Sequence, residues 1–97
     1  MSLNEIREEL NRISEELFYG EIEFSYDAMG FTMAFTHPAE LLGDMCGDLD
    51  AMMEYNSPDR EELEMLLGGL KEMRYSFDLV QLTPAIDGLE SYLKDNT

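Results

Sequence analysis

Residues 39–55 constrain the fold most, because this one stretch has two very different sides. It reads A-E-L-L-G-D-M-C-G-D-L-D-A-M-M-E-Y, and an α-helix advances about 100° per residue. The apolar side chains then fall within an arc of about 140°, and this stripe comprises Leu41, Leu42, Met45, Cys46, Leu49, Met52 and Met53. The opposite side carries five carboxylates, Glu40, Asp44, Asp48, Asp50 and Glu54, with Gly43, Gly47 and Ala51 between them. Other elements of the chain must therefore cover the apolar stripe.

Residues 2–18 predict a first helix that can supply part of this cover. Ser2 and Glu5 have the spacing of a capping box, in which each side chain accepts the other residue's backbone N–H. Arg12 lies four residues from both Glu8 and Glu16, so local ion pairs are expected. Apolar residues recur every three or four positions and form a narrow seam of Leu3, Ile6, Leu10, Ile13 and Leu17.

Residues 21–36 change to a period of two, which predicts a β-hairpin. Ile22, Phe24 and Tyr26 alternate with polar residues, and so do Phe31, Met33 and Phe35 after a turn at Gly30. One face of this hairpin is aromatic, and the other is acidic, with Glu21, Glu23 and Asp27. Because a lone two-stranded ribbon is marginally stable in water, helices are expected to cover its aromatic face.

Three prolines mark the starts of the remaining helices, since proline suits the first helical turn. Pro38, Pro58 and Pro84 predict helices over 38–55, 58–79 and 84–94, with caps at Thr36 or His37, at Ser57 and at Thr83. The inward residues of the last two are Leu63, Leu66, Leu67, Leu70, Met73 and Phe77, then Ile86, Leu89 and Leu93. Gly68 and Gly69 each cost a helix about 1 kcal/mol, so a kink or a close packing contact is expected there.

The predicted fold is therefore α+β. An N-terminal helix and a β-hairpin are followed by three helices that pack on the aromatic face of the hairpin, in one small domain over residues 1–97. No basic segment followed by a long apolar stretch opens the sequence, and no apolar run reaches membrane-spanning length. Together with a single cysteine, which excludes an internal disulfide, this favours a cytoplasmic protein that does not contact a membrane.

Charge is the feature that bears on function. The 97 residues include 22 Asp and Glu against 6 Lys and Arg, a net charge of −16, and no Lys or Arg lies between Arg12 and Arg60. Direct binding of nucleic acid is not expected, because phosphate contacts need clustered basic residues. A basic protein surface is the expected partner. The simplest alternative is a solvated surface that only aids solubility.

No residue pattern predicts catalysis, a metal or a cofactor. Cys46 belongs to the apolar stripe, where a small buried thiol is usual, and His37 suits a turn or helix cap. One histidine and one cysteine cannot complete a tetrahedral metal site. Asp48-Leu49-Asp50 lacks the following ligands of a calcium loop. The chain is therefore expected not to be an enzyme.

Two features leave alternatives open. Gly43, Gly47 and Ala51 would make the acidic side flat enough for a partner to approach, but the same spacing would also let another helix of this fold cross closely. The two alternatives differ in whether Asp44 and Asp48 are exposed. The methionines on the predicted helices are interpreted as core residues, whereas exposed together they would form an adaptable protein-binding patch.

In size and charge, the chain resembles the short acidic inhibitors of phages and mobile elements, including DNA mimics and anti-CRISPR proteins. This resemblance implies an inhibitor that occupies a basic, nucleic-acid-binding surface of a partner protein. The expected contacts are Glu40, Asp44, Asp48, Asp50 and Glu54, flanked by Glu21, Glu23 and Asp27. The alternative is an immunity protein or a secretion-type chaperone for one cognate protein, with a homodimer formed through the hairpin edge.

Overall fold

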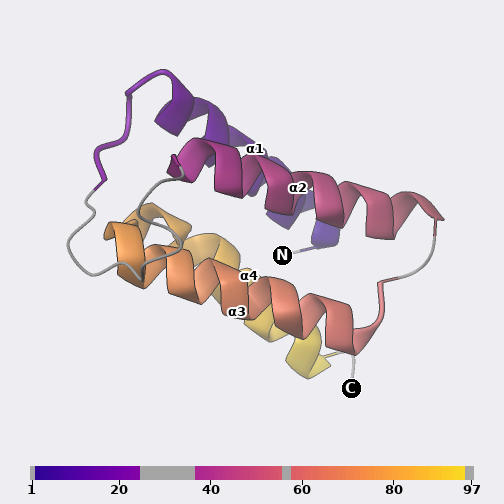
Figure 1. Ribbon diagram of the computed structural model, residues 1–97. Coiled ribbons are helices and arrows are strands. Elements are labelled where there is room, and N and C mark those ends of the chain that lie inside the picture. Colours follow the sequence, from indigo (N-terminus) through magenta and orange to yellow (C-terminus); the bar gives the residue numbers. More distant parts are fainter. Residues whose placement is uncertain (1, 25–36, 56–57, 96–97) are drawn as a thin grey trace.

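Four α-helices make up most of the described chain, which in this computed structural model comprises residues 2–24, 37–55 and 58–95. They are α1 (Leu3–Phe18), α2 (Pro38–Tyr55), α3 (Arg60–Phe77) and α4 (Thr83–Asp95), with a 3-10 turn, η2 (Val80–Leu82), before α4. Successive helices run antiparallel, and the pair α1–α2 forms one layer over the pair α3–α4 (Figure 1). Within these residues, no helix has the length and apolar content that a bilayer-spanning segment needs.

The prediction of an α+β fold is wrong. No strand lies among the described residues, and residues 21–24, where the first strand was expected to begin, are irregular. The remainder of the predicted hairpin, residues 25–36, lies outside the described residues. Ile22 is buried in the helical core, and the Phe24 ring makes edge-to-face contacts with His37 and Phe77 at centroid distances of 5.0 and 6.2 Å.

These contacts give the physical reason for the error. An extended chain turns alternate side chains to one side whether or not it pairs with another strand. Ile22 and Phe24 follow that period because the connection after α1 packs on the helices. An immunity protein or chaperone that binds through a hairpin edge requires paired strands, so the described residues offer that alternative no support.

The helix ends follow from local capping. Ser2 and Glu5 form the predicted capping box, with each backbone N–H 3.1 Å from the other residue's side-chain oxygen. The hydrogen bond that the Ser2 backbone N–H donates to the Glu5 carboxylate is the main cause that lowers the pKa of this carboxyl. α3 begins two residues later than predicted, because the side chain of Asp59 accepts the N–H of Glu62 at 2.8 Å and caps the helix there. It ends at Phe77, and Asp78 follows in the left-handed conformation at φ 56°.

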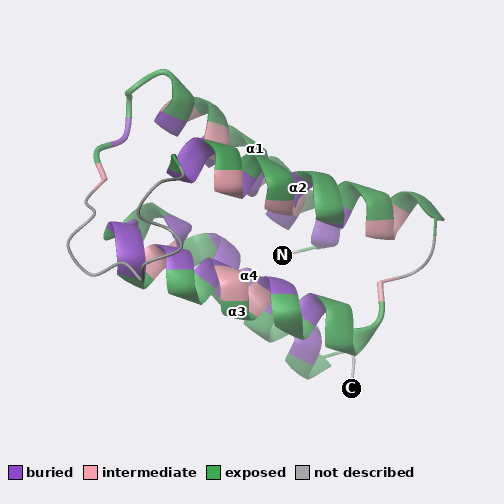
Figure 2. Cartoon of the chain, viewed as in Figure 1, coloured by how far each residue is buried: buried purple, intermediate pink, exposed green. Residues whose placement is uncertain are grey.

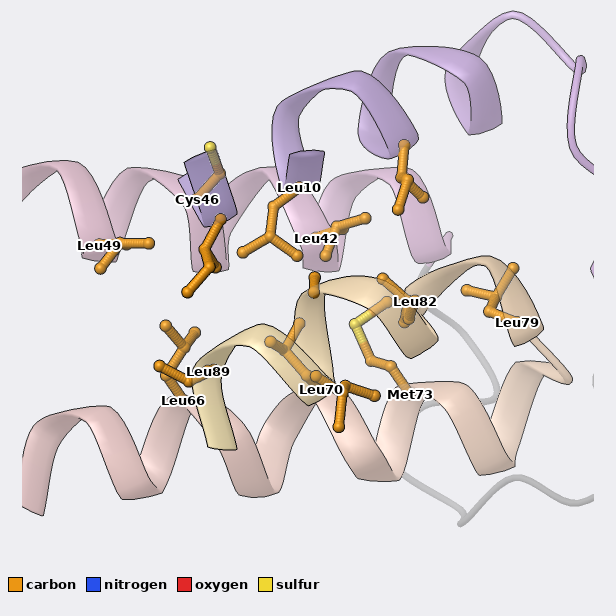
Figure 3. Close-up of a cluster of buried hydrophobic side chains, with 14 of the residues drawn as sticks. Leu10, Leu42, Cys46, Leu49, Leu66, Leu70, Met73, Leu79, Leu82 and Leu89 are labelled. Carbon is orange, nitrogen blue, oxygen red and sulfur yellow. The ribbon is translucent and has the colours of Figure 1, made fainter. Parts of the chain in front are cut away.

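The core lies between the two helix layers. The predicted seam of α1 is buried along its whole length, and the inward residues of α3 and α4 are buried except for the half-buried Leu67 (Figure 2). Leu10, Leu42 and Leu49 of the first layer lie above Leu66, Leu70 and Leu89 of the second (Figure 3). The stripe of α2 is only partly covered, since its buried members are Leu42, Cys46 and Leu49 while Leu41, Met45, Met52 and Met53 are half-buried.

Gly69 provides the close packing contact expected at the two central glycines of α3. A Cβ atom built on Gly69 would lie 2.9 Å from the terminal methyl carbon, Cε, of Met45, so the Met45 side chain lies against the bare backbone. A Cβ atom on Gly68 would meet nothing within 4 Å. One glycine of the pair therefore has a packing role, and its neighbour has open space beside it.

Replacing the two glycines by alanine separates these roles. Gly68→Ala should raise the free energy of unfolding by about 0.8 kcal/mol, because alanine loses less backbone entropy in a helix. Gly69→Ala should raise it by less or lower it, because the new methyl group must displace the end of Met45. Urea unfolding followed by circular dichroism measures both. An equal gain from the two substitutions would contradict the contact between Gly69 and Met45.

Candidate functional site

The carboxylates predicted on the outer side of α2 are all exposed (Figure 2). We name this surface the acidic strip, and it comprises Glu40, Asp44, Asp48, Asp50 and Glu54. Gly43, Gly47 and Ala51 between them are exposed as well. Asp44 and Asp48 therefore lie on the surface. Their exposure is what distinguishes an open acidic side from one covered by another helix.

The glycines in the strip do not serve a helix crossing. A Cβ atom on Gly47 would meet nothing within 4 Å, and one on Gly43 would meet only the Ser14 hydroxyl oxygen, at an ordinary contact distance of 3.5 Å. The alternative in which another helix of this fold crosses the strip is therefore wrong for the described residues. The small residues leave the strip open and low between its carboxylates.

Basic side chains neutralise little of the strip. Arg7 of α1 pairs with Asp50 at 3.0 Å, although no Lys or Arg lies between Arg12 and Arg60 in the sequence. Within the described residues, no Lys or Arg pairs with Glu40, Asp44, Asp48 or Glu54. Other ion pairs lie within α1, within α3 and between α3 and α4: Arg12 with Glu9 and Glu16, Arg60 with Glu64, and Lys71 with Glu90.

The sequence-based prediction missed two acidic residues of α1 that adjoin the strip. Glu8 and Asp50 line one recess between α1 and α2, of about 280 Å³, and Glu15 and Glu40 line another, of about 690 Å³. Arg12 pairs with Glu9 rather than with Glu8, so Glu8 lacks the ion pair expected from its spacing. Glu8 and Glu15 are seven residues apart, which places them on one flank of the α1 seam. This spacing can be recognised in the sequence as a shared helix face. It does not show that α2 is the helix that packs beside that face.

Two of the three acidic residues predicted to flank the strip lie on a different segment from α2. Glu21 and Glu23 are exposed on the connection after α1, at the end of the bundle where α2 begins (Figure 1). Asp27 lies outside the described residues. A role in partner binding remains a prediction for all eight residues named from the sequence.

The histidine and the cysteine have local structural roles. The Ala39 backbone N–H donates to Nδ1 of His37 at 3.1 Å, so His37 caps the start of α2, as one of the two predicted caps. The buried Cys46 thiol donates to the Arg7 carbonyl oxygen at 3.7 Å. Burial and the nearby Asp50 charge raise the pKa of this thiol, which disfavours the reactive thiolate. No cluster of His, Cys, Asp and Glu in the described part of the chain could hold a metal ion.

Comparison with known proteins gives no relative. No protein-family model, curated protein or solved structure matches this chain. The geometry and charge of the surface are therefore the basis for inferring what the protein does.

Like charges four residues apart on the strip should weaken the fold measurably. Asp44 lies one helical turn from both Glu40 and Asp48, and each such pair destabilises a helix by about 0.3 kcal/mol. Asp44→Asn should therefore raise the free energy of unfolding by a few tenths of a kcal/mol in low salt, about as two such pairs predict. In about 1 M NaCl, where charges are screened beyond about 3 Å, the gain should disappear.

Asp50→Asn is the matched control, because it makes the same change on the same helix at the residue that pairs with Arg7. This variant should gain less than Asp44→Asn in low salt. A gain from Asp44→Asn that persists in 1 M NaCl, or an equal gain from both variants, would show that charge repulsion along the strip is not its cause.

Proposed function

We propose that this chain is a non-enzymatic inhibitor that occupies a basic, nucleic-acid-binding surface of a partner protein in the cytoplasm, as DNA mimics and anti-CRISPR proteins of phages and mobile elements do. The carboxylates of the acidic strip stand in for the phosphates of nucleic acid. The observation that carries this proposal is the exposure of Glu40, Asp44, Asp48 and Glu54 without a basic partner among the described residues.

The distribution of charge over the helices supports this proposal. α2 contains five carboxylates and no Lys or Arg, whereas α3 contains four carboxylates and three basic residues. A surface that only kept the protein soluble could spread its charge over all helices. Five carboxylates with no basic residue leave α2 a net charge of −5, whereas five carboxylates with two arginines leave α1 a net charge of −3. The excess of negative charge is therefore greatest on α2, where it would attract a basic surface and speed encounter with it.

The spacing along the strip also suits a surface that binds phosphates. Carboxylates four residues apart on a helix are separated by about 6 Å along its axis. Successive phosphates of one DNA strand advance about 3.4 Å along the duplex axis, so every second phosphate advances about 7 Å. A row of Lys and Arg that contacts alternate phosphates would therefore find carboxylates at similar intervals on α2.

The open surface between the carboxylates would bring them close to the partner. Gly43, Gly47 and Ala51 have no side chain beyond a methyl group, so no bulky group separates a basic side chain from the strip. This is the arrangement that an electrostatic contact needs, since the attraction between opposite charges falls with distance.

Charge reversal tests the proposal. Affinity capture from a lysate of the source organism or its host, at low salt, should recover a nucleic-acid-binding protein that added DNA or RNA displaces. Asp44→Lys with Asp48→Lys should reduce capture at least about tenfold, and capture by the unchanged chain should fall steeply with salt, since close complementary charges drive the association.

The matched control is Asp87→Lys with Asp95→Lys on α4, in the layer that does not contain α2. It changes the net charge by the same amount, so it should leave capture nearly unchanged. Equal losses from the two double variants would mean that total charge rather than the acidic strip attracts the partner. Capture that is indifferent to competitor nucleic acid would contradict the proposal outright.

A further inference from the structure

A groove between α2 and α3 lies directly beside the acidic strip. Its volume is about 610 Å³. Apolar side chains from both helices line it, namely Met45, Met52 and Tyr55 of α2 and Met65 and Leu66 of α3. Asp48 of the acidic strip and the neighbouring Ala51 also line it, so the groove and the strip share one residue, Asp48.

Large apolar side chains along this groove are exposed to solvent. Tyr55 is 76% exposed and Met65 is 73% exposed, while Met45 and Met52 are half-buried. Single exposed apolar residues are common on protein surfaces, whereas several that line one concave surface offer an apolar ligand a place to bind. The methionines interpreted from the sequence as core residues thus divide, because Met73 is fully buried and four others are not.

The groove exists because α2 and α3 are the neighbouring helices that pack least extensively. Met45 extends across to the bare backbone of Gly69, where a Cβ atom would lie 2.9 Å from the Met45 methyl carbon. Beyond that contact, Tyr55 and Leu66 line the space together with the flexible side chains of Met52 and Met65. Such side chains can repack around different apolar partners.

The charge around the groove has one sign. Asp48 and Glu62 line it, and no Lys or Arg does. The three basic residues of α3 act elsewhere, since Lys71 pairs with Glu90 of α4, Arg74 donates to Thr83, and Arg60 donates to the Leu93 carbonyl oxygen. An occupant of this groove therefore needs an apolar face bordered by positive charge.

We propose that the groove between α2 and α3 binds an amphipathic helix of the partner protein that has an apolar face flanked by Lys and Arg. Apolar anchors spaced by three and four residues enter the groove, while the basic flank contacts Asp48, Glu62 and the acidic strip. The inference rests on the proposed function and names the element of the basic partner that the chain recognises. Charge then provides attraction, and the methionine groove distinguishes an amphipathic basic helix from a surface that is basic only.

The length of the groove sets the length of the helix. Met45 and Tyr55 are ten residues apart, or about 15 Å along α2. A helix of about 14 residues spans about 21 Å and covers this distance with one turn to spare.

A synthetic peptide of this length tests the inference without knowledge of the partner. It carries leucines at helical spacing and lysines elsewhere, with one tryptophan on the apolar face, whose fluorescence reports binding because the chain itself has no tryptophan. A second peptide of the same composition in scrambled order has the same charge but no apolar face. The amphipathic peptide should bind the full chain at least about tenfold more tightly, since only it can fill the groove.

Variants of the full chain test whether the peptide binds in the groove. Tyr55→Ser with Met65→Ser should weaken binding of the amphipathic peptide about tenfold, because both exposed anchors are removed. Tyr75→Ser with Val80→Ser is the matched control, since these residues are 73% and 64% exposed but do not line the groove, and it should leave binding unchanged. Circular dichroism verifies that each variant is folded.

The outcomes separate this inference from the proposed function. Equal, salt-sensitive binding of the two peptides that is indifferent to the Tyr55 and Met65 changes would overturn the groove and leave the acidic strip as the docking surface. Groove-dependent binding that resists salt and survives Asp44→Lys with Asp48→Lys would contradict both the proposed function and the contacts of the basic flank with Asp48 and the acidic strip. Sedimentation that shows a dimer broken by the groove variant would identify a second copy of this chain as the occupant and overturn the inference.

Discussion

Burial of aliphatic side chains between two helix pairs is the interaction on which the rest of this structure depends. Each fully buried leucine or isoleucine contributes about 1.5–3 kcal/mol relative to exposure, and the seam of α1 alone provides Ile6, Leu10, Ile13 and Leu17. The same core must offset the self-repulsion of a chain with a net charge of −16. Because the seams are narrow, the outer sides of the helices remain free to carry charge that the fold itself does not need.

The placement of six basic residues decides where that charge stays unbalanced. Arg12 forms pairs within α1, Arg60 and Lys71 form pairs within α3 and with α4, and Arg7 is the one arginine that reaches α2 in the described structure. α2 therefore keeps a row of exposed carboxylates with small residues between them. The groove between α2 and α3 is lined mainly by methionine, tyrosine and leucine side chains. An acidic strip and an apolar groove therefore meet along one helix, which is the combination that a basic amphipathic partner would match.

The sequence predicted the features that depend on local residue patterns. Its predictions were wrong for features that depend on contacts between residues distant in the chain. The α1 seam and the acidic side of α2 follow from helical periodicity, and the start of α2 follows from Pro38. The hairpin was wrong because Ile22 and Phe24 alternate through packing on helices rather than through a sheet. The cap of α3 is Asp59 and not the expected Ser57. Either side chain can accept a backbone N–H, so the sequence alone does not select between them. Which flank of α3 faces α2, and hence the exposure of Met65, is set by neighbours distant in sequence.

The most direct test of this account is a map of the electrostatic potential along the chain in solution, without any partner. Paramagnetic broadening of backbone amide NMR signals is compared between a cationic nitroxide and a neutral nitroxide of the same size, at low salt. The account predicts that the excess broadening by the cationic probe is greatest along residues 40–54 of α2 and falls as salt is added, since screening weakens exposed charge. An excess that is equal on all four helices, or greatest on α3 or α4, would contradict it.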